Sequence, residues 1–346
     1  MPHHHLHAEH GAVDRRTFLR GAVAAGVAVG AVGVGLGVRR ALEPEPWDEA
    51  AFAPPGDARV AVLAATSYDA DLSGMLEDGL REVGADVRGA SVLLKPNLVE
   101  YDPGTSINTD PRMVAAAVLA FRRLGAASVT VGEGPGHRRD TMYVVERSGL
   151  GDALRAVEAP FVDLNLDAVE RVALRSSYTQ LGELWLPRTV TGADIVVSMP
   201  KMKMHHWAGV TLSLKNCFGC VPSRIYGWPK NVLHYQDVQR SILDVAAAVR
   251  PDLAIVDGIV AMEGNGPISG DPVSVGAVVI GDDPVATDVV AASVMGVDPT
   301  AIAYLDEAGR FLGQTDRDRI ATRGEDPARL QAALVPAPGF DGAATG

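Results

Sequence analysis

Lysine and histidine are unevenly distributed in this 346-residue chain. Of its 31 basic residues only five are lysines, and four of those five lie between positions 201 and 234. The same window holds three histidines and both cysteines of the chain, namely His205, His206, His234, Cys217 and Cys220. Because arginine is the usual basic residue here, the few lysines are expected where a compact ammonium group is required. This window is therefore the first candidate for a functional site.

The motif Lys201-x-Lys203-x-His205 predicts a positively charged pocket. In an extended segment these three side chains point to the same side. Lys95 and Lys215 are expected at the same rim, and such a cluster of ammonium groups attracts a phosphate or a carboxylate. Ligand contacts are also predicted for Asn97, Asn216 and Asp257. The alternative is a buried structural network in which the lysines pair with carboxylates, namely Glu133, Asp257 and Glu263.

Acid–base chemistry at this pocket is assigned to Glu133 or Glu263, with His205 as a proton carrier or a metal ligand. Two neighbouring ammonium groups disfavour the cationic imidazole and should lower the pKa of His205. The ring would then be neutral near neutral pH. The adjacent His206 is expected to point the opposite way. No Gly-x-Ser-x-Gly motif is present, so the sequence gives no support for a serine hydrolase.

The pair Cys217-x-x-Cys220 allows three interpretations. The thiols could form a redox pair, which needs a lowered thiol pKa, or they could bind a divalent metal together with His205 and His234. The third interpretation is a structural disulfide or two buried thiols. Two cysteines are too few for a four-cysteine iron–sulfur cluster within this chain. If the thiols form a redox pair, we expect a redox partner protein. If they bind a divalent metal, the sequence does not identify which metal it is.

The pattern of apolar and polar residues predicts an α/β fold with a largely parallel or mixed sheet and helices on both faces, similar to a Rossmann fold. Hydrophobic residues make up 47% of the chain, enough for a packed core, which excludes global disorder. Short apolar runs predict strands at residues 59–63, 91–94, 128–131, 194–198, 253–256 and 275–280. Amphipathic segments predict helices at residues 71–83, 111–124, 235–249 and 284–294. Residues 161–190 are expected to form extra strands or a lid.

Parallel strands place their carboxyl ends at the same edge of a sheet, and ligands bind at this edge in folds of this kind. Lys95 and Asn97 follow one predicted strand, and Glu133 follows another. Residues 200–206 follow a third strand, and residues 257–266 follow a fourth. We therefore expect these segments to form one site.

Several motifs together resemble the uncharacterised family known as domain of unknown function 362. The resemblance covers roughly residues 91–298, and its most specific pieces are Pro200-Lys201-x-Lys203-x-His205 and Leu214-Lys215-Asn216. Further pieces are Lys95-x-Asn97, Thr109-Asp110-Pro111, Gly132-Glu133-Gly134 and Gly219-Cys220-Val221-Pro222. The resemblance implies an α/β fold and a link to iron–sulfur proteins, since some relatives carry a ferredoxin-like module, which this sequence lacks. The mixture of lysine and histidine on one rim is also faintly similar to nickel-pincer racemases.

The N-terminus resembles a twin-arginine export signal, because Arg15-Arg16-Thr17-Phe18-Leu19 precedes an uncharged run at residues 21–38. The alternative is a membrane helix of about 27 Å, barely long enough to span a bilayer. We expect a signal at 1–40, a linker at 41–57, the α/β domain at 58–336 and a tail at 337–346. The export machinery would then place the protein outside the cytoplasm, either in the periplasm or held at the outer face of the membrane by an uncleaved signal.

The net charge of −12 argues against nucleic acid as the main partner, because phosphate backbones bind basic surfaces. The sequence therefore predicts an exported enzyme, dependent on a cofactor or a metal, that acts on an anionic small molecule. The alternative is a non-catalytic extracytoplasmic binding protein for an anionic solute or cofactor.

Overall fold

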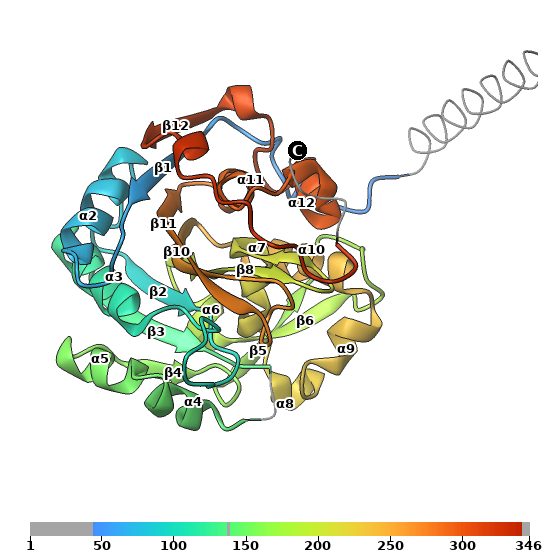
Figure 1. Cartoon of the computed structure of the whole chain (residues 1–346). Helices are drawn as coiled ribbons and strands as arrows, with labels where there is room; N and C mark the ends of the chain where they lie inside the picture. Colours follow the sequence, from blue (N-terminus) through green and yellow to red (C-terminus); the bar gives the residue numbers. More distant parts are fainter. Residues whose placement is uncertain (1–43, 137–138, 341–346) are drawn as a thin grey trace, which may run out of the picture. The chain divides into compact units, whose positions relative to one another are not determined.

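A mixed ten-stranded sheet runs through the part of the chain that the computed structural model describes, residues 44–136 and 139–340 (Figure 1). By their contacts, residues from Trp47 onward form one unit. The predicted export signal at residues 1–40 lies outside the described residues. None of the helices in the described part has both the length and the apolar character needed to cross a membrane.

The main path of the sheet follows the order β12-β1-β11-β10-β7-β2-β3-β4, and β8 is attached through its pairing with β10 and β9. Neighbours on this path are parallel except at β11, which is antiparallel to both β1 and β10. The strands are β1 (Ala58–Ala64), β2 (Ser91–Pro96), β3 (Ser128–Glu133), β4 (Phe161–Asp163), β7 (Ile195–Met199), β8 (Lys201–His205), β9 (Gly209–Thr211), β10 (Leu253–Glu263), β11 (Asp271–Gly281) and β12 (Ile320–Gly324). A separate two-stranded sheet pairs β5 (Val169–Ala173) with β6 (Glu183–Pro187).

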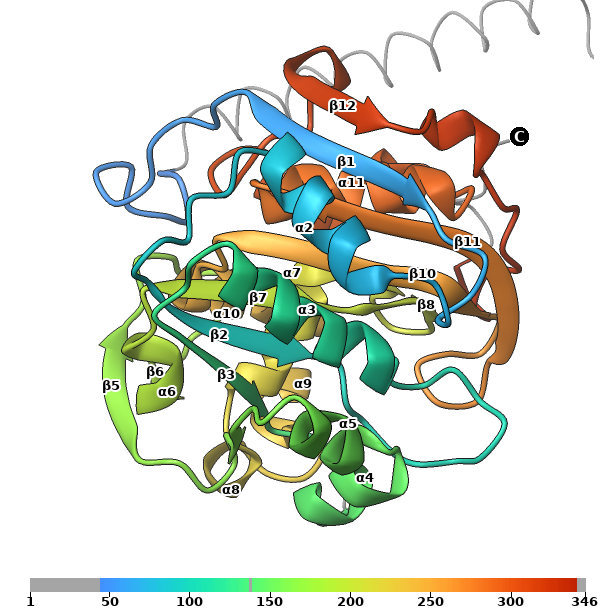
Figure 2. The same cartoon turned by 90° about the vertical axis from the view of Figure 1, so that its left-hand side faces the viewer.

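Helices cover both faces of the large sheet, as the sequence predicts. The helices are α2 (Leu72–Glu82), α3 (Pro111–Arg123), α4 (Thr141–Arg147), α5 (Leu150–Ala156), α6 (Arg188–Thr191), α7 (Ser213–Asn216), α8 (Ser223–Tyr226), α9 (Asn231–Tyr235), α10 (Val238–Val249), α11 (Pro284–Val294) and α12 (Ala303–Ala308). Figure 2 shows α2 and α3 lying over one face of the sheet. Leu76 of α2 and Phe121 of α3 belong to the apolar core on that side, and Ile242 of α10 and Val289 of α11 belong to the second core.

Aspartate side chains begin the four long helices. Each accepts a hydrogen bond from a backbone N–H of the first turn, which has no partner within the helix. These caps are Asp71, Asp110, Asp237 and Asp283. The sequence therefore fixes where these helices start, and with them the lengths of the loops that reach the edge of the sheet.

The largest difference from the predicted elements is in β10 and β11. Residues 257–263 were expected in a loop at the edge of the sheet, but they continue β10, because they pair with β11 as far as Glu263 opposite Asp271. This long antiparallel pair makes the sheet mixed. Residues 161–190 form β4, β5, β6 and α6, which are the extra strands of the first alternative for this segment.

The segment that precedes β1 lies against the domain from Trp47 onward. The Trp47 ring stacks on Phe311 with 4.7 Å between ring centroids, and Phe52 contacts the same ring edge-on at 5.0 Å. At the other end of the chain, Ala337 is fully buried. Parts of the segments expected as linker and tail therefore contribute to the core.

Candidate functional site

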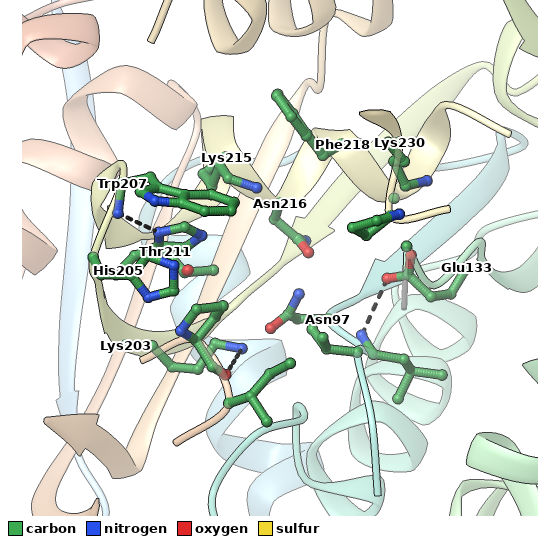
Figure 3. A pocket seen from close by; sticks show the side chains of 18 of the residues that line it. Asn97, Glu133, Lys203, His205, Trp207, Thr211, Lys215, Asn216, Phe218 and Lys230 are labelled. Atoms are coloured by element: carbon green, nitrogen blue, oxygen red, sulfur yellow. Dashed lines mark hydrogen bonds between the residues drawn. The ribbon is translucent and has the colours of Figure 1, made fainter. Parts of the chain in front are cut away.

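A cavity of about 460 Å³ lies at the carboxyl ends of β2, β3 and β8 (Figure 3). This volume is typical of sites for small molecules. The lining includes four of the five lysines of the chain, namely Lys95, Lys203, Lys215 and Lys230. It also includes three histidines, namely His205, His206 and His234. Among the described lining residues, Glu133 carries the one carboxylate.

Lys95 and Glu133 form a buried ion pair in the cavity wall. The distance from Nζ to Oε2 is 2.5 Å, and each side chain is 1% exposed. The Lys95 ammonium also donates to Asn216 Oδ1 at 2.7 Å and to the Pro96 carbonyl at 2.8 Å. The other oxygen of Glu133 accepts from the amide of Gly134 at 2.9 Å. The Lys95 ammonium therefore has three acceptors, one for each of its N–H groups, and Glu133 serves to hold Lys95.

Gly219 allows a turn of backbone to approach this ion pair. It lies in the 3₁₀ turn Cys217–Cys220, and its carbonyl accepts from the amide of Gly134 at 3.1 Å. A Cβ atom at this position would overlap the carboxylate of Glu133 and the ammonium of Lys95. The missing side chain is therefore a steric requirement of the site.

Lys203 is the most deeply buried of the lysines, and none of its surface is exposed to water. Its ammonium donates to the carbonyl oxygens of Ile107 at 2.7 Å and Pro267 at 3.4 Å. Among the described residues it forms no ion pair with a carboxylate. Burial, followed by the charges of Lys215 and Lys201, holds the pKa of Lys203 well below its usual value. An anion in the cavity would favour its protonated form.

Lys215 lies on α7, at the wall of the cavity. Its Nζ is 4.0 Å from the centre of the Phe218 ring, and in the described part of the chain its ammonium has no hydrogen-bond or ion-pair partner. Burial, followed by the Lys95 charge, lowers the pKa of Lys215 to about 7. The helix is fixed from α11, because the buried Asp288 accepts from the first two amides of α7 at 2.7 and 3.0 Å. The position of Lys215 is thus set from the core.

Lys230, which no sequence motif places in the site, lines the cavity at 3% exposure. Its Nζ donates to the carbonyl oxygen of Gly134 at 2.8 Å and to that of Val221. Burial lowers the pKa of Lys230 to about 7. Its backbone has a φ of 65°, an unusual conformation for a residue other than glycine. The rarity of lysine in this chain was the one sequence signal for it.

His205 is held as a neutral ring. Its Nδ1 accepts hydrogen bonds from the backbone amides of Trp207 at 3.1 Å and Ala208 at 3.2 Å. Burial, followed by the charge of Lys215, keeps the pKa of His205 well below its usual value. Since Nδ1 is an acceptor, the proton of the neutral ring is on Nε2. His205 can therefore donate a hydrogen bond through Nε2, but in this state Nε2 cannot act as a base or a metal ligand.

His206 and His234 have the opposite arrangement. Nδ1 of His206 lies 2.6 Å from the carbonyl oxygen of Gly266, and Nδ1 of His234 lies 3.0 Å from that of Lys230. A carbonyl oxygen only accepts, so Nδ1 carries a proton in both rings, and the neutral form of each ring has its lone pair on Nε2. His206 was expected to point away from His205, yet both line the cavity. The reason is that β8 ends at His205, so strand alternation does not extend to position 206.

Two buried oxygen atoms in the cavity wall have no hydrogen-bond partner within residues 44–136 and 139–340. They are Oδ1 of Asn97, which is 8% exposed, and Oγ1 of Thr211, which is 4% exposed. Figure 3 shows both side chains among the residues that surround the cavity. A buried polar atom without a partner costs about 1–3 kcal/mol. These two atoms are therefore suited to contact a polar ligand, as predicted for Asn97 and not foreseen for Thr211.

Two residues of the predicted ligand site, Lys201 and Asp257, lie outside this cavity. Lys201 Nζ is 2.7 Å from Asp257 Oδ2 and 2.8 Å from the Tyr68 hydroxyl, and the Tyr68 hydroxyl donates to Asp257 at 2.7 Å. The register between β8 and β10 jumps, because Lys201 lies opposite Asp257 whereas Lys203 lies opposite Met262. Lys201 and Asp257 therefore form the structural network that was the alternative for this group of residues.

Glu263 is also outside the cavity, in contrast to its predicted catalytic role. Its carboxylate accepts a hydrogen bond from the backbone amide of Val335 at 2.9 Å. The extension of β10 moves this side chain away from the predicted edge of the sheet. Glu263 fixes the C-terminal segment instead.

The two cysteines are buried thiols behind the cavity lining and are not joined by a disulfide. Burial raises the pKa of Cys217 well above its usual value and that of Cys220 to about 12. A redox pair needs the opposite shift. In the described part of the chain, no three histidine, cysteine, aspartate or glutamate residues are grouped to hold a metal ion. The predicted ligand set of His205, His234, Cys217 and Cys220 is thus not brought together.

The fold and the site together define an α/β protein with a lysine-lined cavity at the carboxyl edge of its sheet. Residues 92–293 match the family described as Domain of unknown function (DUF362), and the chain belongs to this family. It is 34% identical over 253 residues to the thylakoid-associated protein of Synechocystis sp., a match that covers 70% of this chain and 76% of that protein.

Two solved structures show a more distant likeness. The first is the lactate racemase apoprotein from Thermoanaerobacterium thermosaccharolyticum, with 15% identity, a TM-score of 0.42 and coverage of 65% of this chain and 54% of that one. The second is a Thermotoga maritima protein solved by structural genomics, with 12% identity, a TM-score of 0.35 and coverage of 61% and 55%. This chain spans just over half the length of each.

Proposed function

We propose that this protein binds a small anionic molecule in the lysine-lined cavity and acts on it as an enzyme. The observation that carries the proposal is the imbalance of charge around the cavity. Four lysines line it, and its one described carboxylate, Glu133, is already paired with Lys95. The other three lysines, Lys203, Lys215 and Lys230, lack a carboxylate partner among the described residues.

Burial, together with the charges of neighbouring lysines, keeps the pKa values of these three lysines low. An anion supplies the missing negative charge, so binding should draw protons onto the cavity. A neutral ligand offers no such compensation. The unpartnered oxygens of Asn97 and Thr211 add two polar contacts that can fix the orientation of the ligand.

Apolar groups also line the cavity, including Phe218, Ile268 and the half-exposed Trp207. This lining suits a molecule with an apolar or planar part beside its charged group. The ligand class is thus an organic carboxylate or phosphate rather than an inorganic ion alone.

Isothermal titration calorimetry tests this proposal with phosphate, acetate, pyruvate and 2-oxoglutarate as probes. We expect binding of at least one organic anion, proton uptake on binding, and a loss of affinity of more than tenfold in Lys203→Met. Arg88→Met removes an exposed positive charge outside the cavity and serves as the control. No binding of any probe, or equal losses in both variants, would argue against an anion site.

The alternative function is a non-catalytic binding protein for an anionic solute or cofactor. It is favoured by the hydrogen bonds of Glu133, whose two carboxylate oxygens already accept from the Lys95 ammonium and from the amides of Leu98 and Gly134. The two functions are separated by incubating the protein with each anion that binds and following conversion by NMR. A bound anion that is recovered unchanged supports the binding protein.

A location outside the cytoplasm is part of the same proposal. It rests on the twin-arginine-like sequence, and the relative in Synechocystis sp. is named as thylakoid-associated. Folding before export would allow a cofactor to be inserted in the cytoplasm.

A further inference from the structure

We propose that Lys215 is the amine that forms an imine with the carbonyl carbon of a 2-oxo acid held in the cavity. This inference rests on the proposed anion-binding function and names its substrate class. It also assigns to Lys215 a role different from that of the other lysines, which hold charge and position.

The four lysines of the cavity differ in what their nitrogen atoms contact. Lys95 has three oxygen partners, including Glu133. Lys203 and Lys230 each donate to two backbone carbonyl oxygens. Lys215 has no such partner in the described part of the chain, and it packs against the Phe218 ring. Its nitrogen is thus the one least restrained by hydrogen bonds.

A nucleophilic lysine must be neutral when it attacks. Burial among apolar groups and a neighbouring ammonium are the two features that favour neutral amines in proteins. Lys215 is buried in the cavity wall beside the charge of Lys95, and its pKa of about 7 provides a substantial neutral fraction at neutral pH. The placement of α7 by Asp288 keeps this amine at the cavity wall.

A 2-oxo acid matches the groups that surround this amine. Its carboxylate is the anion that Lys203 lacks, and its carbonyl lies on the adjacent carbon. His205 can donate to the carbonyl oxygen through Nε2–H, and Thr211 provides a hydroxyl. Figure 3 shows Lys203 and His205 at one side of the cavity and the Glu133 carboxylate at the other. The reacting carbonyl is therefore expected near His205 and away from Glu133.

The reaction is a condensation without oxidation or reduction. The neutral nitrogen of Lys215 forms a bond to the carbonyl carbon, and the carbonyl π electrons move to the oxygen. Both N–H protons end on that oxygen, the carbon–oxygen bond breaks, and water leaves. His205 stabilises the negative charge on the oxygen by its hydrogen bond and keeps its own proton.

Reductive trapping tests this assignment in the full chain. The protein is incubated with pyruvate or 2-oxoglutarate and sodium cyanoborohydride, and its peptides are analysed by mass spectrometry. We expect one adduct on Lys215, with the mass of the 2-oxo acid less one oxygen atom. Lys215→Arg keeps the charge but should give no adduct in the cavity. An absent adduct, or one confined to the N-terminal amine or to other lysines, overturns the proposal.

Calorimetry with the matching 2-hydroxy acids, lactate and 2-hydroxyglutarate, separates failure of the imine from failure of the anion site. These acids keep the carboxylate but have no carbonyl. If both classes of acid bind in a Lys203-dependent manner and no adduct forms, the imine is wrong and the anion site stands. If neither class binds, both are wrong for these acids. Thermal unfolding of Lys215→Arg and Lys215→Met checks that loss of the adduct is not loss of the fold.

Discussion

The ammonium nitrogen of Lys95 lies 2.5 Å from Oε2 of Glu133, and neither side chain is exposed by more than 1%. This pair joins the ends of the neighbouring parallel strands β2 and β3. It pairs one lysine of the cavity with a carboxylate, whereas Lys203, Lys215 and Lys230 have no carboxylate partner among the described residues. The ion pair therefore connects the two strands. It also uses the one carboxylate among the described lining residues, so an anion must come from a ligand.

Glu133→Gln should strongly destabilise the protein, because it leaves the Lys95 ammonium buried without its counter-charge. Loss of one partner of a buried ion pair costs about 3–5 kcal/mol, which urea unfolding can measure. The control is Glu263→Gln, which removes a carboxylate that accepts from one backbone amide and costs about 1 kcal/mol. Equal effects of the two substitutions would show that the pair with Lys95 does not stabilise the fold.

Gly219→Ala should displace the Lys95–Glu133 pair, because the added methyl group would occupy the same space. Overpacking of this kind costs about 1–3 kcal/mol, and we expect anion affinity to fall with it. At Gly56 an added Cβ meets no atom within 4 Å, so Gly56→Ala should change stability by less than about 0.5 kcal/mol. Urea unfolding and calorimetry measure both effects. Wild-type affinity in Gly219→Ala would contradict the steric requirement.

Anion affinity should fall as the pH rises through about 7. Lys215 and Lys230 have pKa values of about 7 in the folded protein, against 10.5 ordinarily, so both lose their protons in this region. Between about 7 and 10.5 the unfolded chain binds more protons than the folded one, so these two lysines make stability rise with pH. Titrations from about pH 6 to about pH 8.5 should show at least a tenfold loss of affinity. Affinity independent of pH would show that the charges of these two lysines do not contribute to anion binding.

Nitrogen NMR should show that His205 is neutral, with its proton on Nε2, while His206 and His234 carry theirs on Nδ1. The reason is that the Nδ1 atom of His205 accepts from two amides, whereas those of the other two face carbonyl oxygens. Because the pKa of His205 lies well below its usual value of 6.5, the ring should stay neutral when the pH falls below 6.5. A proton on Nδ1 of His205 at neutral pH would remove its proposed donor role.

His205→Ala should impair ligand conversion more than His206→Ala, because it removes the buried Nε2–H donor and leaves two amides without their acceptor. His206 is bonded to the Gly266 carbonyl and lies partly in solvent. Parallel assays of both variants, with thermal unfolding as the check on folding, measure the difference. Equal tolerance of both changes would place the chemistry elsewhere in the cavity.

Replacing Arg15 and Arg16 together by Lys should keep the protein inside the cell, since the paired arginines are the core of the predicted export signal. These residues lie outside the described part of the chain. Cell fractionation measures the outcome, and the matched control replaces Arg39 and Arg40 by Lys. Continued export of the first variant would remove the argument for a twin-arginine signal.

The sequence by itself determined the class of fold and the kind of residues at the site. Strands and helices follow from local periodicity, because the spacing of apolar residues decides which side of an element can be buried. Aspartate caps such as Asp110 and Asp283 fix helix starts through hydrogen bonds over two or three residues. The scarcity of lysine is also a sequence property, and four of the five lysines that it singles out line the cavity.

Only the tertiary structure decided which lysines meet. Lys201 and Lys203 are two positions apart in one strand, but the register against β10 shifts between them. Lys201 therefore forms an ion pair with Asp257, whereas Lys203 lines the cavity. Lys230 reaches the site from a loop, and Glu263 leaves it because β10 continues past the expected end. Spacing along the chain fixes the side to which a side chain points, but its neighbours depend on strand register and loop path. Those are set by contacts between residues far apart in sequence, which no local pattern contains.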